Sequence, residues 1–270
     1  MGDSYPNIFS RNLGVLTGEE QEKIRKSAIA IAGVGGVGSM VAERLIRMGV
    51  GKLKITDPDV FDETNLNRHV TAYVSTLGQN KAEAVFKQLK DINPQAEILY
   101  SDAGITDEAS ASDFVSDCDM VIDEMDFGML RESVILQREA RRRGQYYIFS
   151  GAIAFGGVLV IFDPRGLTME EYDKIPFDVD LRQDIPMQSV PMERIMPVVP
   201  SYVPDAINTC YKIMTREIPA PTVSIGVALV AVLTTSEAIN IILKKRDIAV
   251  APAYTYIDLL DRKFVVGSVQ

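Results

Sequence analysis

The stretch SAIAIAGVGGVGSMVAERLIRMGVGKLKITDPD, residues 27–59, decides the expected fold. Its apolar run at 28–32 has the length and the glycine boundary of a buried parallel strand. That run leads directly into the glycine-rich segment 33–38, and a helical pattern of apolar residues follows. A second apolar run at 53–56 ends on Asp57, nineteen residues beyond Gly38. The order strand, glycine turn, helix, strand and acid predicts a nucleotide-binding βαβ unit.

Each part of this unit has a physical role in binding a nucleotide. Gly33, Gly35, Gly36 and Gly38 allow a tight turn and a close approach of the backbone to phosphate. The N-terminus of the following helix offers unpaired N–H groups to an anion, and Asp57 can accept a hydrogen bond from a ribose hydroxyl. The alternative is a glycine-rich turn that serves packing alone.

Composition limits the class of protein. The 270 residues fit one large α/β domain, and 47% hydrophobic residues are enough for a substantial core. The net charge of −9 argues against nucleic acid as a bulk partner, although it allows a local basic pocket. With two cysteines and one histidine, we expect neither a disulfide framework nor a zinc site.

No targeting or membrane segment is evident in the sequence. The N-terminal residues lack a basic segment followed by an apolar core. The longest apolar run, 223–233, is interrupted by Ser224 and Gly226 and is too short to span a bilayer. We therefore expect a cytoplasmic protein without a membrane partner.

The rest of the chain alternates between strand and helix patterns. A loop-like arm, 5–16, precedes a helix that Thr17 caps. Further helices are expected at 81–92, 107–116 and 130–143, and strands at 98–100, 120–122, 146–149 and 156–162. This alternation predicts an α/β fold with a Rossmann-like, doubly wound, mostly parallel sheet. Ligands of such sheets bind beyond the carboxyl ends of the strands.

Residues 163–221 have a different character. They hold nine of the thirteen prolines, show little periodicity, and are too long for an ordinary connection. Their apolar content favours a folded excursion. We therefore expect residues 1–270 to form a single domain, in which 163–222 is a proline-rich substrate or crossover excursion. An apolar helix at 223–243 and a closing hairpin, 254–260 with 263–266, follow.

The residues after Asp57 indicate which nucleotide is bound. They include the motifs Asn65-Leu-Asn-Arg68, Gly78-Gln-Asn-Lys81 and Asp123-x-x-Asp126. Two cations and an acid around the mouth of the fold suit a triphosphate with its magnesium ion. A dinucleotide oxidoreductase is a poorer match, because it would leave Arg68 and Lys81 without a role.

The chain resembles the ThiF/MoeB/HesA family, the bacterial relatives of the adenylation domains of ubiquitin-activating enzymes. The resemblance lies in the arm with Arg11, the glycine turn and these motifs, which follow one another in the family's order. The resemblance covers Arg11 to about Phe162 and resumes in the helix at 223–243. It implies a ThiF-type adenylyltransferase, in which a carboxylate attacks the α-phosphorus of ATP to give an acyl-adenylate and pyrophosphate. It also implies a homodimer, with Arg11 reaching the neighbouring subunit's site.

The resemblance assigns roles residue by residue. It implies that Gly33, Gly35, Gly36 and Gly38 line the phosphates and that Asp57 binds the ribose, with Asp59 beside it as a further nucleotide-binding candidate. It implies that Asn65, Arg68 and Lys81 contact the triphosphate and that Asp126 holds Mg²⁺. The catalytic candidates are therefore Arg11, Arg68, Lys81 and Asp126. We expect His69, directly after Arg68, to make local hydrogen bonds.

The sequence departs from the family pattern at three places. Phe127 follows Asp126 where the family usually has asparagine, the paired C-x-x-C zinc motifs are absent, and 163–221 matches no substrate loop. The leading hypothesis for the substrate is the C-terminal glycine of a ubiquitin-like or sulfur-carrier protein. The alternatives are a peptide, small-molecule or tRNA-linked carboxylate, or a nucleotide-binding scaffold without turnover.

Cys210 is a possible nucleophile, because relatives that form a thioester or persulfide place a cysteine in this general region. Lys212 is two residues away, but no base or strong cationic cluster stands beside Cys210 in the sequence to lower the pKa of its thiol. We therefore favour acyl-adenylate formation without a covalent enzyme intermediate.

Overall fold

The strands of the computed structural model, which describes residues 5–269, form one mixed sheet in the order β3-β2-β1-β4-β5-β6-β7-β8. The first five strands in this order pair in parallel: β3 (Glu97–Ser101), β2 (Lys52–Thr56), β1 (Ala28–Ala32), β4 (Met120–Asp123) and β5 (Tyr146–Ile153). The last three pair antiparallel: β6 (Gly156–Phe162), β7 (Ala253–Asp258) and β8 (Lys263–Ser268). The predicted Rossmann-like fold and closing hairpin are confirmed.

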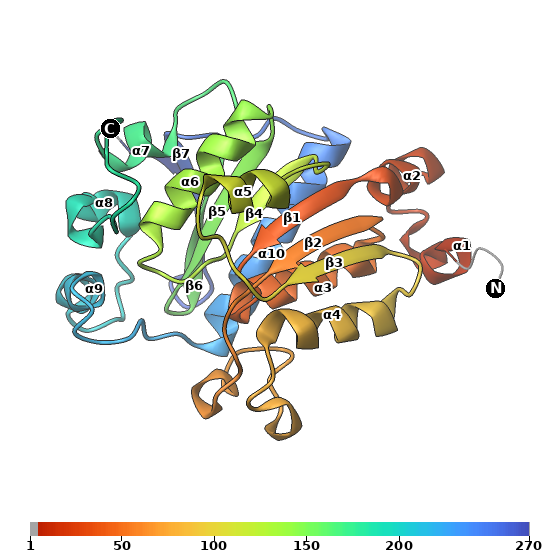
Figure 1. The fold of residues 1–270 in the computed structure, drawn as a ribbon. Helices are drawn as coiled ribbons and strands as arrows, with labels where there is room; N and C mark the ends of the chain where they lie inside the picture. Colours follow the sequence, from red (N-terminus) through yellow and green to blue (C-terminus); the bar gives the residue numbers. More distant parts are fainter. Residues whose placement is uncertain (1–4, 270) are drawn as a thin grey trace.

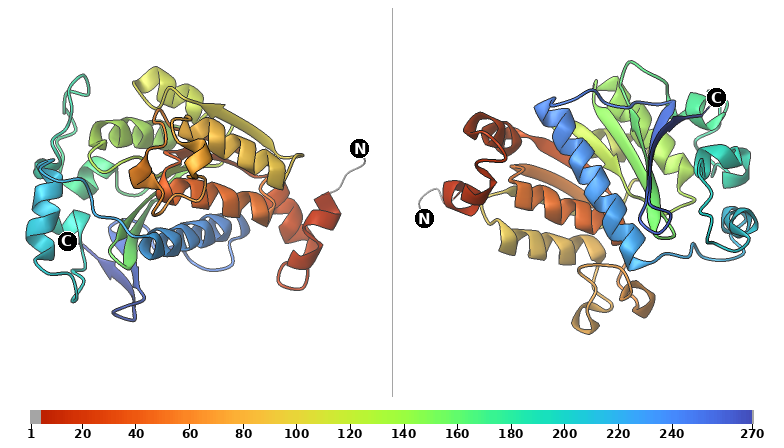
Figure 2. Two further views of the ribbon diagram at one scale, coloured as in Figure 1. Left: turned by 90° about the horizontal axis from the view of Figure 1, so that it is seen from below. Right: turned by 180° about the vertical axis from the view of Figure 1, so that it is seen from behind.

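Helices cover both faces of the sheet (Figures 1 and 2). On one face lie α3 (Gly36–Met48), α4 (Lys81–Ile92) and α10 (Ser224–Leu243), and on the other α5 (Glu108–Phe114) and α6 (Leu130–Arg142). Both faces need a cover because successive side chains of β1 point to opposite faces of the sheet. Ile29 and Ile31 join the core under α3, whereas Ala30 joins the core under α6. The sheet is therefore doubly wound.

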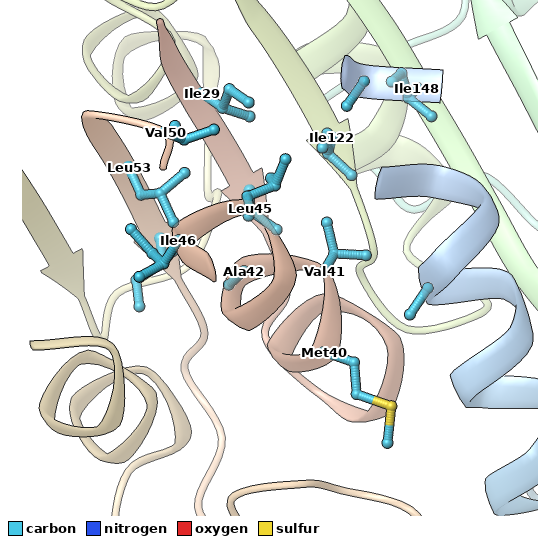
Figure 3. Packing of buried hydrophobic residues seen from close by; sticks show 14 of the residues in the cluster. Ile29, Met40, Val41, Ala42, Leu45, Ile46, Val50, Leu53, Ile122 and Ile148 are labelled. Carbon is cyan, nitrogen blue, oxygen red and sulfur yellow. The ribbon is translucent and has the colours of Figure 1, made fainter. Parts of the chain in front are cut away.

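Side chains spaced along one stripe of α3 make its contact with the sheet. Figure 3 shows Val41 and Leu45 directed toward the strands that carry Ile29 and Ile122. All four of these side chains are fully buried. Since burial of such a side chain contributes roughly 1.5–3 kcal/mol, this packing stabilises the position of α3 against β1 and β4.

The N-terminal arm, predicted as a loop, instead contains two short helices, α1 (Tyr5–Ile8) and the 3₁₀ helix η1 (Ser10–Asn12). Tyr5 and Phe9 are buried, and the Tyr5 hydroxyl donates to the carbonyl of Gly49, 2.7 Å away. The arm is thereby anchored at the C-terminal end of α3. The next helix, α2 (Gly18–Lys26), has the predicted Thr17 capping box.

Residues 163–222 contain short helices that the sequence pattern did not predict: α7 (Met169–Asp173), the 3₁₀ helix η4 (Met187–Ser189), α8 (Met192–Ile195) and α9 (Ala206–Met214). Met169, Tyr172 and Ile175 pack into the core under α6. The excursion then continues along one side of the molecule to α10 (Figure 1). Three of these helices, α7, η4 and α8, have only five, three and four residues, which is too few for a readable periodicity.

Helix α10 is long and apolar enough, by length and composition, to cross a bilayer. The expectation from the interrupted run 223–233, that this segment is too short, was therefore wrong. Most of α10 is buried inside the protein, where it packs on α3, β5 and β6. Its apolar composition is that of a core helix.

Candidate nucleotide-binding site

The glycine turn joins β1 to α3 at the carboxyl edge of the sheet. Gly33 has a left-handed backbone (φ +81°), and a Cβ added there would lie 2.3 Å from the carbonyl oxygen of Glu124. A Cβ on Gly38 would lie 2.0 Å from the carbonyl oxygen of Gly33. Gly35 is the N-cap residue of α3 and makes no side-chain cap. The N–H groups of the first turn therefore remain available to an anion.

Asp57 follows β2 and holds the glycine turn in place. Its carboxylate accepts the backbone N–H of Val34 at 2.9 Å and that of Asp59 at 3.0 Å. Burial raises its pKa, while the positive charge of Lys81 acts in the opposite direction. A carboxylate has lone pairs for further bonds, so this arrangement leaves capacity for the predicted contact with ribose.

Lys81 begins α4, and its nearly buried side chain returns to the same edge. Its Nζ atom lies 2.8 Å from Oδ2 of Asp59. The neighbouring Asn80 caps α4 by accepting the N–H of Glu83 at 3.0 Å, and it donates to the carbonyl of Asp57 at 3.0 Å. From the sequence, Asn80 was expected only as part of the motif Gly78-Gln-Asn-Lys81. The structure shows that Asn80 ties the start of α4 to the end of β2.

Arg68 and Asn65 lie in the protruding segment between β2 and α4, which also contains the 3₁₀ helices η2 (Glu63–Asn65) and η3 (Val74–Thr76). The backbone carbonyl oxygen of the buried Asn65 accepts the backbone N–H groups of Arg68 and His69, at 3.1 and 3.0 Å. The resulting turn brings Cγ of Arg68 within 3.5 Å of a Cβ built on Gly36. Arg68 donates from Nη1 to the carbonyl of Thr64, 2.9 Å away, and keeps further donors for a ligand.

The three acids at the carboxyl end of β4, of which Asp123 is the last residue of the strand, have different environments. Asp123 is fully buried and accepts the hydroxyl of Tyr147, and burial raises its pKa. Glu124 accepts the Ser150 hydroxyl at 2.6 Å, and burial raises its pKa well above the usual range. The side chain of Asp126 is exposed and makes no hydrogen bond or ion pair with residues 5–269. Of the three, only Asp126 is free for a ligand.

Two hydroxyl groups form a chain of hydrogen bonds that ends on the carboxyl group of Glu124. Thr234 of α10 is fully buried and donates to the Ser150 hydroxyl at 2.9 Å. The sequence analysis missed this contact. Ser150 could have been noticed because it lies near the carboxyl end of a predicted strand, whereas nothing in the sequence connects it to Thr234, 84 residues away.

Arg11 is exposed and lies in η1, far from the glycine turn of its own chain. The arm contacts the C-terminal end of α3, whereas the turn forms its N-terminal end (Figures 1 and 2). The thirteen residues of α3 separate the two ends by roughly 20 Å. Any contact between Arg11 and a nucleotide would therefore require a second subunit.

Cys210 lies on α9, where it packs with Met196, Ala206 and Met214 in a small apolar cluster separate from the main core. It is only 8% exposed, and burial raises the pKa of its thiol. A nucleophilic cysteine needs the opposite, a lowered pKa and an accessible sulfur atom. This environment does not favour a nucleophilic role for Cys210, in line with the preference for acyl-adenylate formation without a covalent enzyme intermediate.

The fold and this edge define a Rossmann-like nucleotide-binding protein. The family model described as "ThiF family" matches residues 9–269, and the chain belongs to that family. The resemblance noted from the motifs is thus confirmed. Among the described residues, 5–269, no three His, Cys, Asp or Glu side chains gather as a metal site.

Individual relatives are similar over part of the chain. The chain is 41% identical over 118 residues to a tRNA threonylcarbamoyladenosine dehydratase of Bacillus subtilis (strain 168), covering 44% of this chain and 46% of the relative. It is 38% identical over 115 residues to ubiquitin-like modifier-activating enzyme 5 of Aedes aegypti, covering 41% and 28%. The matched segments thus span less than half the length of these relatives.

A solved structure shows the same fold over nearly the whole chain. A crystal structure of E. coli MccB with ATP superposes with a TM-score of 0.70 at 18% identity, covering 99% of this chain and 73% of that chain. At this identity the comparison supports the fold alone.

Proposed function

We propose that this protein catalyses ATP-dependent adenylation of a carboxylate. One observation carries the proposal: the glycine turn, two cations (Arg68 and Lys81) and a free carboxylate (Asp126) share one edge of the sheet. Strand β1 pairs with β2 on one side and with β4 on the other, so the segments that carry these groups are neighbours. Each group has the chemistry that a triphosphate or its metal ion requires.

The reaction needs positioning and charge neutralisation more than proton transfer. The attacking carboxylate is already ionised at neutral pH, so no general base is necessary. The pyrophosphate that leaves carries increasing negative charge, which Arg68 and Lys81 would neutralise. The N-terminus of α3 would orient the phosphates against the attacking carboxylate.

The residues present fit a bound Mg²⁺ ion. Magnesium is usually held by one or two carboxylates together with substrate phosphates, so it does not require a cluster of protein ligands. The carboxylate of Asp126 meets this requirement, because it is exposed and has no partner in the described part of the chain, residues 5–269. When bound, Mg²⁺ would neutralise phosphate charge.

As the leading acyl substrate we propose the C-terminal glycine of a ubiquitin-like or sulfur-carrier protein. The similarity to ubiquitin-like modifier-activating enzyme 5 supports this choice. A tRNA-linked carboxylate is the second candidate, supported by the name of the B. subtilis relative. Two surface hollows border the arginines of α6, but Arg138 and Arg142 are paired there with carboxylates, each at 2.6 Å. Because binding of tRNA requires cations that are free to meet its phosphates, this pairing and the net charge of −9 favour the protein substrate over the tRNA-linked one.

Exchange of labelled pyrophosphate into ATP tests the proposal. The protein with ATP and Mg²⁺ is combined in parallel with ubiquitin-like proteins that end in Gly-Gly and with tRNA carrying threonylcarbamoyladenosine. We expect exchange with one of these carboxylates and none without it. ATP binding without exchange under any condition would instead support a nucleotide-binding scaffold, and failure to bind ATP would overturn the proposal.

A further inference from the structure

His69, the single histidine of the chain, lies against the glycine turn. A Cβ built on Gly35 would lie 3.5 Å from its Cε1 atom, and one built on Gly36 would lie 3.5 Å from its Cδ2 atom. Because Nε2 is bonded to both of these carbons, the edge of the ring that carries Nε2 faces the two glycines. These glycines form the start of α3, where an anion would bind.

The nitrogen atoms of this ring have no hydrogen-bond partner among residues 5–269. His69 is only 7% exposed, and its Nδ1 atom is buried without a hydrogen-bond partner. Within residues 5–269, Nε2 has no partner either. The ring packs edge-on against Phe61, with centroids 5.8 Å apart. An apolar side chain would fill this space without leaving a polar nitrogen unpaired, so packing alone does not account for a histidine.

We propose that His69 is a phosphate-binding residue that donates its Nε2–H group to the nucleotide at the N-terminus of α3. The inference rests on the proposed function, because it requires a nucleotide in this site. His69 would act beside Arg68 as a neutral donor that recognises phosphate without adding charge.

The charge state of the ring is consistent with this role. Burial lowers the pKa of His69 to about 3, and the positive charges of Arg68 and Lys81 act in the same direction, against the carboxylates of Asp62 and Asp59. The ring is therefore neutral near pH 7 and has one N–H group. With that proton on Nε2, the buried Nδ1 is left as an unpaired acceptor and the N–H group faces the glycine turn.

NMR of the untagged protein labelled with ¹⁵N-histidine tests this directly, because the chain contributes one set of imidazole signals. We expect both ATP and pyrophosphate to shift the Nε2 signal and its bound proton, and adenosine to leave them unchanged. ATP binding that leaves these signals unmoved would overturn the role of His69 while the proposed function stands. If the protein does not bind ATP, both proposals fail.

Two substitutions provide a second measurement. His69→Leu keeps an apolar side chain without a donor, whereas His69→Gln keeps a donor. We expect His69→Leu to weaken ATP binding roughly tenfold to a hundredfold, as loss of a hydrogen bond to a charged group does, and His69→Gln to restore most of it. Adenosine affinity should be the same in both variants. An equal loss of ATP and adenosine binding in both variants would indicate a structural role and contradict the proposal.

Discussion

The ammonium group of Lys81 lies 2.8 Å from the carboxylate of Asp59 and links the first residue of α4 to the segment that follows β2. The side chain of Lys81 is 9% exposed and that of Asp59 is 51% exposed. The cation is therefore held by the fold, while its partner faces solvent. A triphosphate would take the place of this exposed carboxylate as the partner of Lys81.

We expect Lys81→Ala to reduce pyrophosphate exchange by about a hundredfold or more, as removal of a preorganised charge does. Lys87→Ala is a matched control on the same helix, because the Lys87 side chain is 60% exposed and forms an ion pair with Glu83 one turn away. Exchange rates of both variants, measured at saturating carboxylate, provide the comparison. Equal rates in the two variants would remove Lys81 from the site.

Arg68→Ala should give a similar loss of exchange, because Arg68 lies over the start of α3. Arg47→Ala, on the exposed side of α3 in an ion pair with Glu43, is the control and should keep the wild-type rate. A wild-type rate in the Arg68 variant would contradict its assignment.

Two glycines with almost the same positive φ allow the cost of conformational strain to be measured separately from the cost of close packing. Gly33 (φ +81°) and Gly78 (φ +80°) are both left-handed, but a Cβ on Gly78 would meet nothing within 4 Å. We expect Gly78→Ala to lower the free energy of unfolding by about 1–2 kcal/mol. Gly33→Ala should lower the free energy of unfolding by about 1–3 kcal/mol more than Gly78→Ala does, because the added methyl group meets the backbone of Glu124. Urea unfolding would measure both, and equal losses would contradict the close approach.

The homodimer that the family resemblance implies predicts complementation between two inactive variants, Arg11→Ala and Asp126→Ala. In a mixed dimer with two-fold symmetry, one of the two sites receives an intact Arg11 and an intact Asp126. A freely exchanging equal mixture should therefore recover roughly one quarter of the wild-type exchange rate. Mixing the Arg11→Ala variant with the double variant Arg11→Ala/Asp126→Ala should recover no pyrophosphate exchange, because no site then receives an intact Arg11. A protein that sediments as a monomer and still catalyses pyrophosphate exchange would contradict the shared site.

We expect Cys210→Ser to retain pyrophosphate exchange, because adenylation does not use the thiol. It should also retain product formation, because the buried thiol with its raised pKa is a poor nucleophile. Mass spectrometry of the wild-type protein after incubation with ATP and its substrate should show no adduct. An adduct on Cys210 that dithiothreitol removes would show that the acyl group passes through the enzyme.

The lowered pKa of His69 predicts a specific pH dependence of stability. Between the ordinary pKa of 6.5 and about 3, the unfolded chain binds a proton at this residue and the native chain does not. Stability therefore falls as the pH falls through this window, by up to about 1.4 kcal/mol per pH unit. The raised pKa values of Asp123 and Glu124 act in the opposite direction. The measurement is thus the difference in urea unfolding between the wild type and His69→Gln, and a difference independent of pH would contradict the prediction.

Much of the nucleotide-binding half could be predicted from the sequence because its information is local. The length of β1, the glycine spacing at 33–38 and the acid at Asp57 lie within one short stretch, where strand period, turn geometry and helix period are each determined by near neighbours. The motifs carrying Arg68 and Lys81 could be assigned to the same edge, because the carboxyl ends of parallel strands meet there.

The remaining features depended on contacts between distant segments. Packing of Tyr5 on the C-terminal end of α3 separates Arg11 from its own glycine turn. Burial among methionines places Cys210 out of reach. The contact between Thr234 and Ser150, and the orientation of the His69 ring toward Gly35 and Gly36, also arise only when the elements pack together. The sequence by itself determined which local elements form and which chemical groups they carry. Only the tertiary structure decided which of those groups are buried, paired or free to meet a ligand, because burial and pairing depend on residues far apart along the chain.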